Sequence, residues 1–137
     1  MGIKSIEAYP VTLRYREPFR IAPSTTVENH NIIVKVMTDF GVVGIGESSP
    51  SERVTHETTQ TVIKALDKIA PHLVGMCPLR IEQISETMNE LVPENPSVKA
   101  AIDIALHDIL GKAAHKPLCK LIGGFREDIL TDLTLSI

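Results

Sequence analysis

The chain has 137 residues, of which 43% are hydrophobic and 23% are charged, and 14 lysine and arginine residues against 17 acidic residues give a net charge of −3. These values are typical of one folded domain and exclude an intrinsically disordered chain. The acidic balance, with no run of basic residues, argues against nucleic acid as a partner, and the lack of an apolar stretch of about 20 residues argues against a membrane.

The first third of the chain is typical of β-strands separated by turns. We predict strands over residues 3–15, 31–38 and 42–47. Within the first strand the apolar residues change parity at Pro10, which indicates a bulge or an edge position. Residues 20–30 are polar, and we predict a loop there between the first two strands.

From Thr55 onward the apolar period changes from two residues to about 3.6, which predicts helices. The first helix is predicted over about 56–70, with Thr55 as its N-cap and Pro71 as its end. Two more helices are predicted over about 78–92 and 97–114. The third is the most apolar of the three.

The last part of the chain combines a short turn with an apolar segment. The turn is predicted at 117–122, and residues 129–137 alternate like a strand. Gly111 lowers the helix propensity of the third helix, so we expect a close packing partner beside it. Strands followed by helices predict an α+β fold, in which a three-stranded antiparallel meander packs one face against a bundle of three to four helices.

The candidate chemical motifs have simple structural explanations. Gly44-Ile45-Gly46-Glu47 lacks the third glycine of a dinucleotide fingerprint, so we expect its glycines to allow a close approach of two backbones. Asp103 with His107, and Asp108 with Lys112, are spaced by four residues, as in surface charge pairs of a helix. The residues alone identify no catalytic constellation.

The N-terminus indicates where the protein is located, and the two cysteines bear on zinc and disulfide chemistry. Residues 1–4 do not begin an apolar signal-peptide core, so we expect a cytoplasmic location. Cys77 and Cys119 form no Cys-x-x-Cys pair and have no histidine at ligand spacing, so we expect neither a zinc site nor a disulfide framework.

The segment AAIDIALHDILGKAAHKPLCKLIGG, residues 100–124, closely resembles a hallmark of the enolase superfamily. In the mandelate racemase and muconate-lactonizing branch, the N-terminal capping domain typically ends in a pattern similar to A-I-D-x-A-L-x-D-x-x-G-K. The resemblance extends to Pro18-Phe19-Arg20-Ile21-Ala22 and to residues 44–50. The loop that contains residues 18–22 and the final segment TDLTLSI look most like those of dipeptide epimerases of the L-Ala-D/L-Glu type.

The resemblance implies a capping domain over residues 1–128 and the first strand of a (β/α) barrel over residues 129–137. A complete barrel of this kind needs about 250 residues. It also implies an isomerase that abstracts a proton next to a carboxylate, with Mg²⁺ stabilising the enediolate. The catalytic lysines and the Mg²⁺ ligands are expected beyond Ile137, so the chain alone should be inactive. A homo-oligomer acting on a small carboxylate or dipeptide is expected.

In such enzymes two loops of the capping domain cover the barrel mouth, and they correspond here to residues 19–26 and 48–54. The resemblance implies that the substrate pocket has an apolar lining formed by Phe19, Ile21 and Val54. It also implies that hydrogen bonds to the substrate come from Ser24, Thr25 and Thr134. As alternatives, Phe19 packs in the domain core, and Ser24 and Thr25 are ordinary loop residues.

One departure from the family pattern concerns the substrate. Alanyl-glutamate epimerases tend to carry an arginine near the position of Ser24, where it could pair with a side-chain carboxylate. This chain has Pro23-Ser24-Thr25 there, and Arg20 lies four positions earlier. We therefore expect a dipeptide that lacks the acidic side chain, or a different carboxylate.

Two other functions stay open at this point. The chain could be a self-standing binding or interaction module with the capping fold. The parent enzyme could also be an N-acylamino acid racemase, an o-succinylbenzoate synthase or a muconate cycloisomerase.

Overall fold

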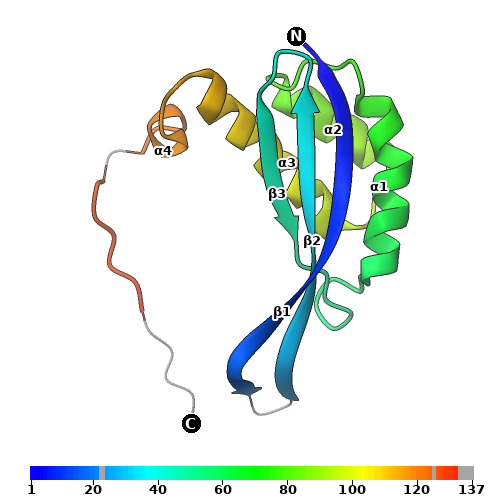
Figure 1. Cartoon of the computed structure of the whole chain (residues 1–137), viewed down its shortest axis with the longest axis vertical. Helices are drawn as coiled ribbons and strands as arrows, with labels where there is room; N and C mark the ends of the chain where they lie inside the picture. The colour runs from blue at the N-terminus through cyan, green and yellow to red at the C-terminus, as the bar shows by residue number, and fades with distance from the viewer. Residues whose placement is uncertain (22–23, 125, 133–137) are drawn as a thin grey trace.

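The computed structural model describes residues 1–21, 24–124 and 126–132. Its antiparallel sheet has the order β1-β2-β3, formed by β1 (Ile3–Ile21), β2 (Ser24–Thr38) and β3 (Val43–Ser48). Figure 1 shows α1 (Thr59–Leu73), α2 (Ile81–Leu91) and α3 (Pro96–Ala113) on one face of the sheet, followed by α4 (Leu118–Leu121). The predicted α+β fold is confirmed.

The hydrophobic core lies between the sheet and the three long helices. Alternate residues of β2 point into it, because Ile32, Val34 and Val36 are completely buried. Each helix contributes the apolar stripe that its periodicity predicted. The buried helical side chains are Val62, Ala65, Leu66, Ile69, Leu73, Ile84, Met88, Val98, Ala101, Ile102, Ala105, Leu106 and Ile109.

The predicted loop over residues 20–30 is wrong, because most of it belongs to a long β-hairpin. β1 and β2 stay paired out to Ile21 and Ser24, well past the end of the helical layer (Figure 1). No helix covers this part of the hairpin, so neither face needs apolar residues, and period-two alternation disappears. Cross-strand polar contacts take its place, such as Arg14 Nε to Glu28 Oε2 at 3.6 Å and Thr12 Oγ1 to His30 Nδ1 at 3.1 Å.

The bulge expected at Pro10 lies elsewhere. Pro10 pairs in register with Ile32, and the long interruption falls between Arg14 and Phe19. The expected edge position is confirmed, since β1 forms one edge of the sheet. The apolar residues change parity because Ile6 and Ala8 pack against the core, whereas odd-numbered residues farther along β1 point to the sheet face that the helices leave open.

The helix boundaries differ from the predictions by a few residues. Thr58, and not Thr55, caps α1, because Thr58 and Thr61 exchange the side-chain bonds of a capping box. Pro71 lies inside the last turn of α1, which continues to Leu73, whose side chain is anchored in the core. α2 begins at Ile81, three residues after Pro78, whereas α3 begins within one residue of its prediction.

The two ends of the chain differ in how they are held. At the N-terminus, Ile3 exchanges backbone hydrogen bonds with Gly75 and Met76, at 2.8 and 2.9 Å. Residues 129–132 of the predicted last strand form no strand within the described structure, and residues 133–137 lie outside it.

None of the helices in the described ranges has the length and apolar character needed to cross a bilayer.

Candidate functional site

The tip of the hairpin is separated from its stem by a large bulge. Arg14 pairs with Glu28 and the next pair is Phe19 with Thr26, so residues 15–18 face Val27 alone. Such a bulge bends a strand and redirects the side chains beyond it. The tip therefore has an orientation of its own relative to the stem.

Phe19 lies on this tip and outside the core. Its side chain is 43% exposed, and its ring stacks on Tyr15 with the centroids 6.1 Å apart. Tyr15 is held in turn by Asn29, whose Nδ2 donates to the tyrosine hydroxyl at 2.9 Å. The alternative that Phe19 packs in the core is thus wrong, and a half-exposed aromatic pair marks the tip.

The other predicted residues of the first segment are placed less completely. Thr25 is exposed and pairs with Arg20 across the hairpin. The backbones of Ile21 and Ser24 pair at the end of the hairpin, and their side chains are outside the described structure, as is Thr134. Their substrate contacts remain predictions.

The second predicted segment, residues 48–54, belongs to a compact loop that is built around Ser51 and extends to Glu57; residues 49–57 are called the second segment below. The Ser51 carbonyl accepts hydrogen bonds from the backbone N–H groups of Val54, Thr55 and Glu57, at 3.2, 2.9 and 3.4 Å. The Thr55 hydroxyl donates to the same oxygen at 3.0 Å. This arrangement leaves the Val54 side chain 76% exposed, where it is free to contact another surface.

The stem of the hairpin and the second segment border one cavity of about 550 Å³. Its lining is mostly polar and includes Thr12, His30, Glu52 and Gln60. None of the site residues predicted from the sequence is among the described residues that line it. The hairpin stem and the second segment therefore lie side by side at this cavity, and the described side chains of Phe19, Thr25 and Val54 are not part of its lining.

The position of β3 relative to α3 depends on the two glycines of the Gly-x-Gly motif. A Cβ atom at Gly44 would lie 2.0 Å from the carbonyl oxygen of Ala105, and one at Gly46 would lie 1.9 Å from that of Ala101. Only glycine fits at such distances, so the expected close backbone approach is confirmed.

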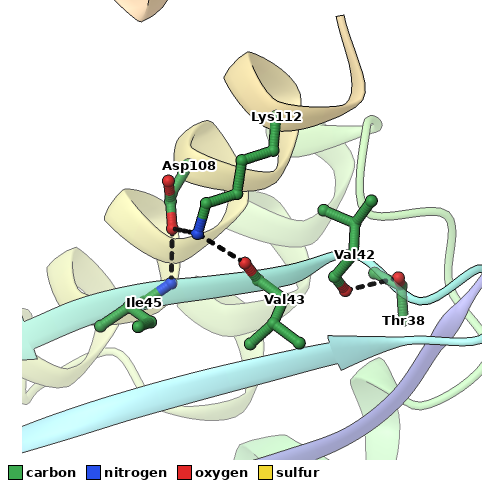
Figure 2. A network of polar contacts seen from close by, with 6 residues as sticks. All are labelled: Thr38, Val42, Val43, Ile45, Asp108 and Lys112. Atoms are coloured by element: carbon green, nitrogen blue, oxygen red, sulfur yellow. Dashed lines mark hydrogen bonds and ion pairs between the residues drawn. The ribbon is translucent and has the colours of Figure 1, made fainter. Parts of the chain in front are cut away.

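Two charged residues of α3 fasten the outer edge of β3 (Figure 2). Asp108 Oδ2 accepts the N–H of Ile45 at 2.9 Å, and Lys112 Nζ donates to the Val43 carbonyl at 2.8 Å and to Asp108 at 2.6 Å. The predicted helical pair is present, and it also binds the strand. Lys112 is a structural residue in this arrangement.

The described residues do not fit a Mg²⁺ site. Across residues 1–21, 24–124 and 126–132, no three His, Cys, Asp or Glu side chains are placed together so that they could hold a metal ion.

Sequence reasoning missed two residues that shape this site. Tyr15 supports Phe19, but it lies in a bulge that no apolar period reveals. Glu57 is not among the site residues predicted from the sequence, yet its side chain is 2% exposed and binds the start of α3. The only sign of this role in the sequence is that Glu57 directly precedes Thr58, the N-cap of α1.

Several known proteins resemble the whole chain. A hydrophobic dipeptide epimerase of Enterococcus faecalis is 35% identical over 137 residues, which are 100% of this chain and 39% of that protein. An N-succinyl-L-Arg/Lys racemase of Bacillus cereus is 37% identical over 139 residues and covers 100% of this chain and 38% of its own length. The chain thus spans about two fifths of the length of these curated relatives.

Solved structures agree with these similarities. The dipeptide epimerase from Enterococcus faecalis V583, complexed with Mg and the dipeptide L-Leu-L-Tyr, matches with a TM-score of 0.94 at 35% identity, over 100% of this chain and 39% of that chain. The dipeptide epimerase from Cytophaga hutchinsonii, complexed with Mg and D-Ala-L-Val, has a TM-score of 0.93 at 33% identity over 100% and 38% of the two chains. Residues 5–123 match the family described as mandelate racemase / muconate lactonizing enzyme, N-terminal domain, and the chain belongs to that family.

Proposed function

We propose that this chain is the capping, substrate-specificity domain of a Mg²⁺-dependent dipeptide epimerase of the enolase superfamily. The parent enzyme abstracts the α-proton of a dipeptide through an enediolate, and the groups that do this, with the Mg²⁺ ligands, lie beyond Ile137. The observation that carries the proposal is the match along the entire chain to an epimerase complexed with Mg and a dipeptide, at a TM-score of 0.94.

The division of the chain follows from the same proposal. Residues 1–128 form the capping domain, and residues 129–137 begin the barrel. The exposure of Ile129 and Leu130, at 79% and 101%, supports this, because a large apolar pair that is bare here would gain from burial against further chain. We expect the parent enzyme to be a cytoplasmic homo-oligomer.

The substrate is proposed to be a dipeptide with an apolar distal side chain. Phe19 and Val54, one on each segment, are 43% and 76% exposed, so each presents apolar surface to solvent. Pro23-Ser24-Thr25 offers no guanidinium where alanyl-glutamate epimerases carry an arginine. A relative named as a hydrophobic dipeptide epimerase supports the same choice.

The test uses the complete protein encoded with this chain, in the presence of Mg²⁺. Exchange of the α-proton for deuterium is measured by mass spectrometry for dipeptides with apolar, acidic and basic second residues. We expect the apolar dipeptides to exchange fastest, and no exchange with the isolated chain. Much faster exchange of Ala-Glu would refute the apolar preference.

A second candidate activity is racemisation of N-succinylamino acids. It is favoured by the 37% identity to the N-succinyl-L-Arg/Lys racemase of Bacillus cereus. Including N-succinyl-arginine in the same exchange assay separates the two activities, because a dipeptide epimerase exchanges it more slowly than its dipeptide substrate.

A further inference from the structure

Both ends of the second segment, residues 49–57, are fastened to one residue in the first turn of α3. At the start, the Ser48 hydroxyl donates to Ser97 Oγ at 2.9 Å. At the end, both carboxylate oxygens of Glu57 lie within hydrogen-bond distance of the Ser97 backbone N–H, at 3.3 and 3.2 Å. Ser48 and Glu57 are only 1% and 2% exposed, so solvent does not compete with these bonds.

The Glu57 carboxylate also completes the N-terminus of α3. Pro96 is the first residue of α3 and has no backbone N–H. The side chain of the N-cap residue, Asn95, accepts no hydrogen bond from the backbone of the first turn. Ser97 therefore carries the first N–H of the helix, and Glu57 is its acceptor. A buried carboxylate is favoured there by charge-assisted hydrogen bonding and by the helix dipole.

Within the segment, the same glutamate is tied to the Ser51 turn. The Glu57 N–H donates to the Ser51 carbonyl, which also accepts from Val54. A displacement of the Glu57 side chain is thus transmitted through two hydrogen bonds to the backbone of Val54. The exposed side chain of Val54 takes its position from a buried contact on the other side of the loop.

We propose that Glu57 and Ser97 are positioning residues that set the location of Val54 and thereby the substrate preference of the parent enzyme. The proposal rests on the proposed function, because Val54 meets a substrate only if residues 49–57 cover an active site. Loss of the anchor loosens a remote contact with the substrate, so it raises KM and weakens the discrimination between distal side chains more than it lowers kcat.

The first experiment measures the anchor itself, by trypsin cleavage after Arg53 in the folded protein. Glu57→Ala should raise the cleavage rate about tenfold, the usual effect of losing a buried hydrogen bond to a charged group. The cleavage rate of Glu57→Gln should lie between those of the wild type and Glu57→Ala, because the amide oxygen of glutamine still accepts one hydrogen bond. Glu86→Gln, on an exposed position of α2, is the matched control and should leave cleavage unchanged.

A second control separates positioning from general destabilisation. Ile84→Val removes one methylene from the core on α2 and should lower the unfolding midpoint without changing cleavage after Arg53. If Glu57→Ala does not fold, Glu57→Gln and Ser48→Ala carry the comparison, since each weakens one of the two ties to Ser97. Unchanged cleavage in folded anchor variants would overturn the proposal.

The second experiment measures kinetics in the complete enzyme with Mg²⁺ and two dipeptides that differ in the size of the distal side chain. For Glu57→Gln we expect KM to rise about tenfold for the preferred dipeptide, a smaller preference between the two, and kcat within about twofold of the wild type. Unchanged KM and preference would overturn the specificity role. A wild-type enzyme that acts on no dipeptide would instead refute the proposed function, while the cleavage assay would still decide the anchoring.

Discussion

Replacing Gly46 by alanine tests the contact between β3 and α3 most directly. In an ordinary strand this change stabilises the folded state by about 0.5–1 kcal/mol, because alanine loses less backbone entropy on folding. Here the added Cβ would meet the Ala101 carbonyl oxygen at 1.9 Å, which is 1.5 Å short of an ordinary contact of 3.4 Å. The sign of the effect should therefore reverse.

The size of the loss follows from what has to move. The nearest atoms belong to the backbone of α3 at Ala101 and Ala105, so no side chain can rotate away. The helix must lift from the sheet and loosen the packing of buried residues such as Ile102 and Leu106. Overpacking in a core costs about 1–3 kcal/mol, and we expect the upper end, about 3 kcal/mol, or roughly 10 °C in Tm.

Urea unfolding followed by far-UV circular dichroism measures this difference, with Gly111→Ala as the matched control. At Gly111 the new Cβ would lie 3.3 Å from the Lys116 carbonyl oxygen, and the helix gains about 1 kcal/mol of propensity, so the net change should be small. If Gly46→Ala unfolds within about 0.5 kcal/mol of the wild type, α3 does not contact β3 as described.

Three further variants test other contacts. The pKa of Asp39 is lowered below 3.8, mainly because the backbone N–H of Gly2 donates to its Oδ1 at 2.9 Å. The resulting stabilisation of the folded state is present above pH 3.8 and is lost as the pH falls through the lowered pKa. Asp39→Asn should therefore reduce the loss of stability at acid pH in a plot of unfolding free energy against pH. Lys112→Met should lower the free energy of unfolding by about 1 kcal/mol in urea titrations, because it leaves the Val43 carbonyl without its donor. Gly111→Leu should lower the thermal unfolding midpoint, since overpacking of about 1–3 kcal/mol outweighs the gain in helix propensity; an unchanged midpoint would mean that the glycine is incidental.

The elements with a buried face could be predicted from the sequence, and the others could not. The apolar stripes of α1 and α3 and the alternation of β2 at Ile32–Val36 report burial, and the structure buries those residues. The outer hairpin has no covered face, so its strands are held by backbone pairing and polar contacts that leave no periodic signal.

The site divides in the same way. The motif that resembles the enolase superfamily led to the right family, and the close approach at Gly44 and Gly46 followed from the residue type. The stack of Tyr15 on Phe19 and the anchor at Glu57 could not be predicted. Both depend on contacts between segments that only the folded chain brings together.

The fastening of β3 by Asp108 and Lys112 has a consequence for how the sheet can associate. The outward N–H of Ile45 and carbonyl of Val43 would otherwise form a ladder for an incoming strand, and both are already bonded to side chains of α3. Strand addition at this edge would have to break an ion pair as well as displace two hydrogen bonds. Growth of the sheet by an added strand, whether in misassembly or in recognition, is therefore directed to the opposite edge, along the part of β1 beyond Ile3, which is already bonded to Gly75 and Met76.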